Sequence, residues 1–334
     1  MTNRLTSRFL VGRVASLSLA GALALGLAAC GGGGGSDPDD GGTPPPSGSA
    51  QGSLLYASSN KAVRFDIAAR TETSVSLATE SNDQLGLAGS LATDVEEVTH
   101  VTALPNEYTI NLRRVNASGF ESLGALPVIS ATGLRVSGPV QPSPDGTRFA
   151  LHTRESTLDD PEDTDHVYVI DRNGQTLLHA ADYRDPVWTG NNSVVVAGAD
   201  GLFELTVGAS TARRIGSQGL GRPGSQPKQP AVSADGRSIA FVQGDAVWRI
   251  GVDGAGLAQL TQQRFEQGWP AWSADASKLV VLRGSCPVLG TTEPPPDVVI
   301  ISATSPNQDI NAASAVMRTD SVPLRTCGPV YWLP

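Results

Sequence analysis

Five carboxylates stand within seven residues of this chain, at Asp159, Asp160, Glu162, Asp163 and Asp165. Carboxylate oxygens are ligands that calcium prefers, so this acidic stretch is a candidate cation site. Its spacing does not match the EF-hand loop, and it has no glycine for that loop's sharp turn. We expect a solvated hairpin loop here, with a weak calcium or partner site as the alternative.

Other signatures of catalysis are missing or stand in the wrong context. The sequence has no Gly-x-Ser-x-Gly, no His-Glu-x-x-His and no Gly-x-x-x-x-Gly-Lys. Residues 219–224 match Gly-x-Gly-x-x-Gly, but a dinucleotide site needs a helix next, and Pro223 and later prolines oppose one. The four histidines, which are scattered in sequence, are His100, His152, His166 and His179. The sequence therefore favours a binding protein over an enzyme, and we expect no cofactor.

The first residues have the order of a secretory signal. Arg4, Arg8 and Arg13 precede an apolar run over residues 14–29, and no acid occurs before Cys30. The run is shorter than the roughly 20 residues that span a bilayer. It ends in Leu-Ala-Ala-Cys, which resembles the bacterial lipobox. The resemblance implies cleavage after residue 29 and lipidation of Cys30.

Residues 30–51 are expected to form a flexible tether. They contain almost no apolar side chain whose burial could offset the entropy of ordering. A chain of this length has a mean reach of about 25 Å. Gly31, and not Asp, follows the cysteine, which in the sorting of Gram-negative lipoproteins favours the outer membrane, facing the periplasm.

Composition restricts the partners of the remaining domain, residues 52–334. Cleavage would remove three arginines and no acids, so the net charge would fall from −9 to −12. Nucleic acid is a poor partner for such a chain, because phosphate binding requires basic clusters. Membrane attachment must then come from the lipid. Acylation of Cys30 leaves Cys286 and Cys327, which we expect to form one disulfide, although a redox or metal pair is the alternative.

One phrase recurs along the domain. It reads PVQPSPDGTRFALH at 139–152, PAVSADGRSIAFV at 230–242 and PAWSADASKLVVL at 270–282, with a degenerate copy at 186–198. The aligned residues Ser143, Thr189, Ser233 and Ser273 are 46, 44 and 40 residues apart. Each copy contains a polar turn and then β-branched strands, which predicts about four short strands per repeat. This pattern is typical of a propeller blade.

The phrase resembles the WD40-like propeller repeat of the TolB type. That resemblance implies an all-β, six-bladed propeller that serves mainly as a protein-binding platform. TolB proteins carry an α/β domain before the propeller, whereas a tether stands there in this chain, so their partners are not carried over. Some related propellers act on polysaccharides with axial histidines and acids.

The two ends of the domain predict how the ring closes. Residues 53–58 and 62–67 look like the second and third strands of a blade without its first strand. Residues 328–334 supply a Pro-x-aromatic strand of the missing kind, so we expect the C-terminus to complete the first blade. The weakest blade, residues 84–130, should have its central strands at 95–103 and 108–115.

Aromatic residues recur at one position of the repeat, at Trp188, Trp272 and Tyr331. We expect these three to pack between blades, and Trp269, outside the apolar phase, to contact a partner. The sequence as a whole favours a lipid-anchored binding scaffold of the bacterial cell envelope with a protein partner. A polysaccharide-binding or polysaccharide-degrading propeller and an assembly factor for outer-membrane proteins are the alternatives.

Overall fold

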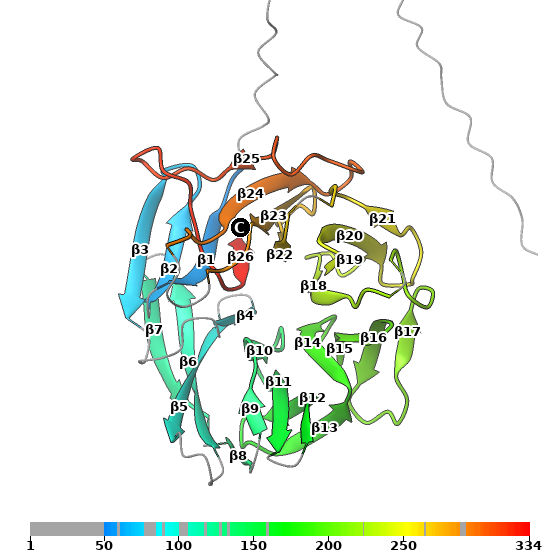
Figure 1. Cartoon of the computed structure of the whole chain (residues 1–334). Coiled ribbons are helices and arrows are strands. Elements are labelled where there is room, and N and C mark those ends of the chain that lie inside the picture. Colours follow the sequence, from blue (N-terminus) through cyan, green and yellow to red (C-terminus); the bar gives the residue numbers. More distant parts are fainter. Residues whose placement is uncertain are drawn as a thin grey trace, which may run out of the picture. The chain divides into compact units, whose positions relative to one another are not determined.

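The computed structural model describes residues 50–58, 61–76, 85–88, 91–99, 106–116, 119–126, 129–131, 134–157, 160–222, 224–263, 265–287 and 292–334. Within these ranges the chain is all β, without a helix, and its strands form six antiparallel sheets. The sheets are arranged as the blades of a propeller (Figure 1). The predicted six-bladed all-β fold is therefore confirmed.

Each blade has four strands in order from the axis to the rim. The innermost strands are β26 (Val330–Leu333), β4 (Gly86–Ala88), β10 (Gln141–Pro142), β14 (Tyr183–Trp188), β18 (Lys228–Val232) and β22 (Gln267–Trp272). The second strands are β1 (Ser53–Ser58), β5 (Leu91–Thr99), β11 (Arg148–Thr157), β15 (Ser193–Gly198), β19 (Ser238–Gln243) and β23 (Lys278–Arg283).

The outer half of each blade follows the same order. The third strands are β2 (Lys61–Asp66), β6 (Asn106–Asn116), β12 (Asp160–Asp171), β16 (Gly201–Thr206), β20 (Ala246–Gly251) and β24 (Asp297–Ser302). The rim strands are β3 (Thr71–Ser76), β7 (Gly119–Ala125), β13 (Thr176–Ala181), β17 (Arg213–Ile215), β21 (Ala258–Gln259) and β25 (Ser314–Ala315). Two short strands, β8 (Ile129–Ala131) and β9 (Leu134–Val136), extend blades 2 and 3.

The C-terminal strand closes the ring. Strand β26 pairs with β1 in antiparallel register from Ser53 opposite Leu333 to Tyr56 opposite Val330. The first and last segments of the domain therefore form one blade, β26-β1-β2-β3, as the sequence predicted. Closure removes the open inner edge that β1 would otherwise present.

Six apolar clusters form the core, and each lies between two neighbouring blades. In the cluster between blades 1 and 6, Leu54 and Phe65 pack with Val280 and Val298, all without solvent exposure. Trp188 belongs to the cluster between blades 3 and 4, and Trp272 to that between blades 5 and 6. Tyr331 packs between blades 1 and 2, so the predicted role of the three repeated aromatics is confirmed.

The recurring Ser-x-Asp phrase builds the turn between the first and second strands. Ser143 donates a 2.6 Å hydrogen bond from Oγ to Asp145, whose carboxylate also accepts the backbone N–H of Thr147. Gly146 follows with a φ of 66°, a value that glycine adopts readily. The same turn recurs at Ser233 with Asp235 and at Ser273 with Asp275. The motif that identified the repeat is therefore a structural turn.

Candidate functional site

A pocket of about 770 Å³ lies at the centre of the ring, and we call it the axial funnel. It is bounded by residues of the innermost strands and of the turns that follow them, in all six blades. Its aromatic lining residues are Trp188, Trp269, Trp272, Tyr331 and Trp332. Prolines from five blades alternate with these rings, among them Pro139, Pro186, Pro230, Pro270 and Pro329.

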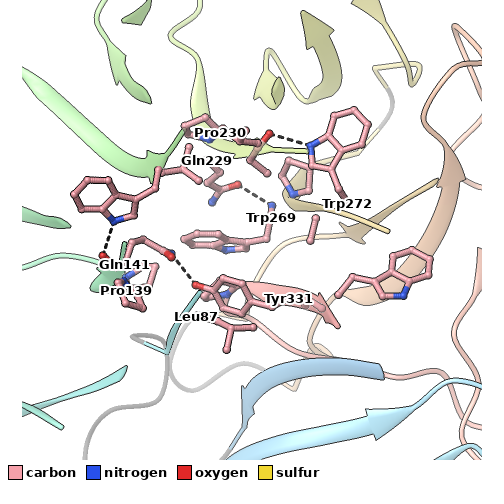
Figure 2. A pocket seen from close by; sticks show the side chains of 18 of the residues that line it. Leu87, Pro139, Gln141, Gln229, Pro230, Trp269, Trp272 and Tyr331 are labelled. Carbon is pink, nitrogen blue, oxygen red and sulfur yellow. Dashed lines mark hydrogen bonds between the residues drawn. The ribbon is translucent and has the colours of Figure 1, made fainter. Parts of the chain in front are cut away.

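Most of the indoles in the funnel are held by hydrogen bonds to a neighbouring segment. Trp188 donates from Nε1 to the carbonyl oxygen of Gln141, at 2.8 Å, and Trp272 donates in the same way to Ala231, at 2.9 Å (Figure 2). Each bond joins the innermost strand of one blade to that of the preceding blade. Trp332 donates to the carbonyl oxygen of Gln51, at 2.9 Å. The funnel wall is thus preformed.

Tyr331 connects three blades at the funnel wall. Its hydroxyl donates to the carbonyl oxygen of Leu85 in blade 2, at 2.8 Å, and accepts from Nε2 of Gln141 in blade 3, at 2.7 Å. Burial raises the pKa of the Tyr331 hydroxyl well above its ordinary value. The hydroxyl is therefore a fixed structural donor and not an acid for chemistry.

Trp269 lies in the funnel and not on an outer surface. Its side chain is half-buried, points into the middle of the pocket and packs against the core between blades 1 and 6 (Figure 2). Its backbone N–H donates to Oε1 of Gln229, at 3.0 Å. The backbone N–H of Gln229 in turn donates to Asp185, at 2.9 Å. A chain of side-chain-to-backbone contacts thus crosses blades 4, 5 and 6.

His152 lies between two carboxylates at the edge of the funnel. Its Nε2 is 2.8 Å from Asp165 and its Nδ1 is 3.6 Å from Asp185, and only 6% of its side chain is exposed. Arg154 donates to the same Asp165 carboxylate, at 3.0 Å. Burial alone would raise the pKa of Asp165, but the hydrogen bonds from His152 and Arg154 hold it below its ordinary value.

No local sequence pattern predicts this cluster, because its members come from three strands in two blades. Another pair of histidines also meets: Nδ1 of His166 is 3.0 Å from Nε2 of His179, and Tyr168 stacks on His179 with ring centroids 4.3 Å apart. The pairing of β12 with β13 brings them together. His100 lies outside the described residues. Among the residues that are described, no group of three or more His, Cys, Asp or Glu is placed to hold a metal ion.

The acidic stretch differs from the predicted loop. Strand β12 begins at Asp160, opposite Thr157, so residues 160–165 belong to a strand, and the prediction of a loop over them is wrong. A long hairpin of β11 and β12 explains the difference, since cross-strand pairing extends to residues that looked unstructured. Asp159 and the side chains of Asp160, Glu162 and Asp163 lie outside the described residues, and Asp165 is engaged by His152. The calcium site stays a prediction.

The two downstream cysteines are brought together. Cys286 lies in the insertion between β23 and β24, and Cys327 lies just before β26. Sγ of Cys286 is 3.4 Å from the carbonyl oxygen of Cys327. This proximity agrees with the expected pairing, and the disulfide stays a prediction. Cys30 and the rest of the signal and tether to residue 49 lie outside the described residues. In the described part, no helix is long and apolar enough to cross a membrane.

Residues 219–224 form the connection from β17 to β18, as expected for an inter-blade loop, with Pro223 outside the described residues. Gln243 organises this connection, since its Nε2 lies within 3.0 Å of the carbonyl oxygens of Gly219, Arg222 and Ser225. Residues 224–232, which the structure describes, contain no helix, so the dinucleotide interpretation has no structural basis there.

Solved structures with a similar fold include two TolB structures. No protein-family model matches the chain, and no curated protein does. TolB from Acinetobacter baumannii is similar in structure, with a TM-score of 0.53, 14% identity and coverage of 86% of this chain and 68% of that one. A protein described as TolB from Agrobacterium tumefaciens has a TM-score of 0.50 and 17% identity, over 78% and 88% of the two chains.

A chain of the nidogen–laminin complex has the same TM-score as the first TolB structure, 0.53, at 10% identity over 84% of this chain and 98% of that one. Identities this low show the fold alone. By its fold, this chain is a six-bladed β-propeller similar to the TolB structures and closed by its own C-terminal strand.

Proposed function

We propose that this protein is a lipid-anchored, non-catalytic binding scaffold of the bacterial cell envelope, whose axial funnel receives an extended segment of a partner protein. The observation that carries the proposal is the funnel itself, a preformed cavity lined by fixed indoles and prolines. Buried aromatic side chains of this kind dominate the energetics of protein interfaces.

The size of the funnel favours a segment over a folded domain. A volume of about 770 Å³ lies within the range of roughly 300–1,000 Å³ that is typical of pockets for single ligands. A folded partner would contact only the rim, whereas an extended chain can enter and bury its side chains against the rings. The similar propeller of the nidogen–laminin structure comes from a protein complex, which supports the use of this fold for protein binding.

The ionisable groups near the funnel support a binder over an enzyme. Both ring nitrogens of His152 face carboxylates, and Asp165 already accepts from His152 and Arg154. A general base must be within reach of a substrate proton, and these groups face one another. They are best explained as a structural network that joins blades 3 and 4.

The membrane part of the proposal rests on Cys30 and the tether. Because the mature chain would carry a net charge of −12, repulsion from an anionic bilayer surface makes a lipid necessary for attachment. The tether enters the domain at Gln51, whose carbonyl oxygen accepts from the funnel residue Trp332. The proposed location is the outer membrane, facing the periplasm, because Gly31 and not Asp follows Cys30.

Site-specific photocrosslinking in the host cell tests the protein-binding proposal. A photoreactive phenylalanine analogue at Trp332 should give a discrete protein adduct, which mass spectrometry identifies. The matched control is the same analogue at Phe265, an aromatic residue with 51% exposure outside the funnel lining. Adducts that form equally at both positions, or at neither, would contradict a protein-binding funnel. An adduct with an outer-membrane barrel would specify an assembly factor.

A polysaccharide is the second candidate ligand, favoured by the presence of His152, Asp185 and Arg64 among the funnel residues. In this alternative, Asp185 and Arg64 hydrogen-bond sugar hydroxyls while the indoles stack on the sugar rings. Calorimetry with envelope polysaccharides tests this alternative, and Asp185→Asn should weaken any binding. Absence of heat, together with a protein adduct at Trp332, would reject it.

A further inference from the structure

Three innermost strands carry the same irregularity at the residue before their proline. Asp185, Gln229 and Trp269 have φ values of 51°, 52° and 47°, and each interrupts the register with the second strand of its blade. Non-glycine residues rarely adopt this conformation, and a following proline disfavours helical backbone further. Strained residues of this kind cluster at ligand sites. All three line the funnel.

Two hydrogen bonds between these residues hold their strained backbone in place. Asp185 accepts the backbone N–H of Gln229, and Gln229 accepts that of Trp269 through Oε1. Each side chain thus fixes the irregular backbone of the next blade. The sequence shows the position only as the residue before a repeated proline, in Asp-Pro, Gln-Pro and Trp-Pro.

This arrangement leaves two donors available in the funnel. Nε1 of Trp269 and Nε2 of Gln229 form no hydrogen bond with any of the described residues. The indoles of Trp188, Trp272 and Trp332, by contrast, already donate to backbone carbonyls. A ligand that satisfies both donors must therefore carry hydrogen-bond acceptors next to apolar rings that can pack on the indoles.

We propose, resting on the function proposed above, that the funnel recognises a proline-rich segment of the partner in the polyproline II conformation. In that conformation the backbone carbonyls have no internal hydrogen bonds, and prolyl residues have no N–H that needs an acceptor. Trp269 and Gln229 donate to two such carbonyls, and the prolyl rings pack on the indoles. Aromatic grooves recognise proline-rich segments in this general way.

Isothermal titration calorimetry of the full propeller with an acetylated deca-proline peptide tests the proposal. We expect saturable one-site binding. Trp269→Phe keeps a ring but removes the donor, and should weaken binding about 3- to 10-fold, the effect of one net hydrogen bond. Gln229→Glu keeps the acceptor for the Trp269 N–H but replaces the donor, and should weaken binding about 10-fold or more.

Trp248→Phe is the matched control, because Trp248 is not among the funnel residues and the donor that the change removes is bonded to the carbonyl oxygen of Gln243. It should change the affinity less than about 2-fold. Equal losses for Trp269→Phe and Trp248→Phe, or no binding of the peptide to the unaltered protein, would overturn the proposal. If the peptide does not bind but Trp332 still crosslinks a protein, the binding scaffold stands and the proline-rich ligand is wrong. If neither occurs, both proposals fall.

Discussion

Tyr331 donates a hydrogen bond of 2.8 Å to the carbonyl oxygen of Leu85, which lies 246 residues earlier in the chain. Because Tyr331 belongs to the closing strand β26 and Leu85 precedes β4, this contact joins the closing strand to blade 2. The same hydroxyl accepts from Gln141, so one atom connects blades 1, 2 and 3. Closure is therefore held by a side chain as well as by strand pairing.

Tyr331→Phe should destabilise the propeller by about 1–3 kcal/mol, because the Leu85 carbonyl loses its buried donor. Urea unfolding followed by circular dichroism measures the change. Tyr183→Phe is the control, since the Tyr183 ring packs on Phe203 and its hydroxyl bonds to no described residue. A loss of equal size in both variants would show that the hydroxyl contacts do not matter.

Deletion of residues 328–334 should remove a large part of the stability, which for a domain is about 5–15 kcal/mol in total. The deletion exposes the edge of β1 and opens the core between blades 1 and 6, which contains Val330. Thermal unfolding and size-exclusion chromatography would show an early transition and aggregation. Deletion of exposed Pro334 alone is the control, and an unchanged transition after the longer deletion would contradict closure by β26.

The Ser-x-Asp turns predict a loss of stability in acid. The hydrogen bond from Ser273, followed by those from Ser277, lowers the pKa of Asp275 from 3.8 to about 2. A carboxylate with a lowered folded pKa contributes stability above its unfolded pKa and loses it as the pH falls through the folded value. Asp275→Asn should therefore lower the urea midpoint at pH 7, and the difference from the unaltered protein should shrink between about pH 4 and pH 2. A difference that stays constant over that range would contradict the assignment.

Cys286 and Cys327 should be joined by a disulfide in protein that has been exported to an oxidising compartment. Non-reducing peptide mapping by mass spectrometry would detect the bridge, and two alkylated thiols would refute it. In the chain-entropy treatment, a bridge that closes a loop of this length contributes on the order of 4 kcal/mol. The double variant Cys286→Ser with Cys327→Ser should therefore unfold at a lower urea concentration. Added reductant should lower the urea midpoint of the unaltered protein to the same value and leave the midpoint of the variant unchanged.

Cys30→Ser should release the protein from the membrane fraction without changing the fold of the propeller. The cysteine lies outside the domain that carries the core, so thermal unfolding of the released protein should match that of the purified domain. Fractionation with antibody detection measures the distribution. A protein that stays with the membrane after this substitution would show that lipidation at Cys30 is not its anchor.

Much of the fold follows from local patterns in the sequence. The Ser-x-Asp turns and the β-branched runs define hairpins by contacts within a few residues. The strands predicted at 53–58 and 62–67 therefore agree with β1 and β2 to within one residue, whereas the strand predicted at 95–103 begins four residues earlier, at Leu91. The Pro-x-aromatic strand at 328–334 was recognised as the missing partner of residues 53–58, and β26 occupies that place. The hairpin of β11 and β12 extends further than predicted, because pairing across strands stabilised residues whose polarity alone indicated a loop.

The sequence by itself determined the repeat and the ring, because a turn motif and β-branched runs are properties of short segments, and its export signal and lipobox-like end stay predictions. Only the tertiary structure decided what lies at the axis. His152 meets Asp185, and Gln229 holds Trp269, because the strands of successive blades converge there. Convergence depends on the packing of blades against one another, which joins residues more than 30 positions apart and leaves no local pattern in the sequence.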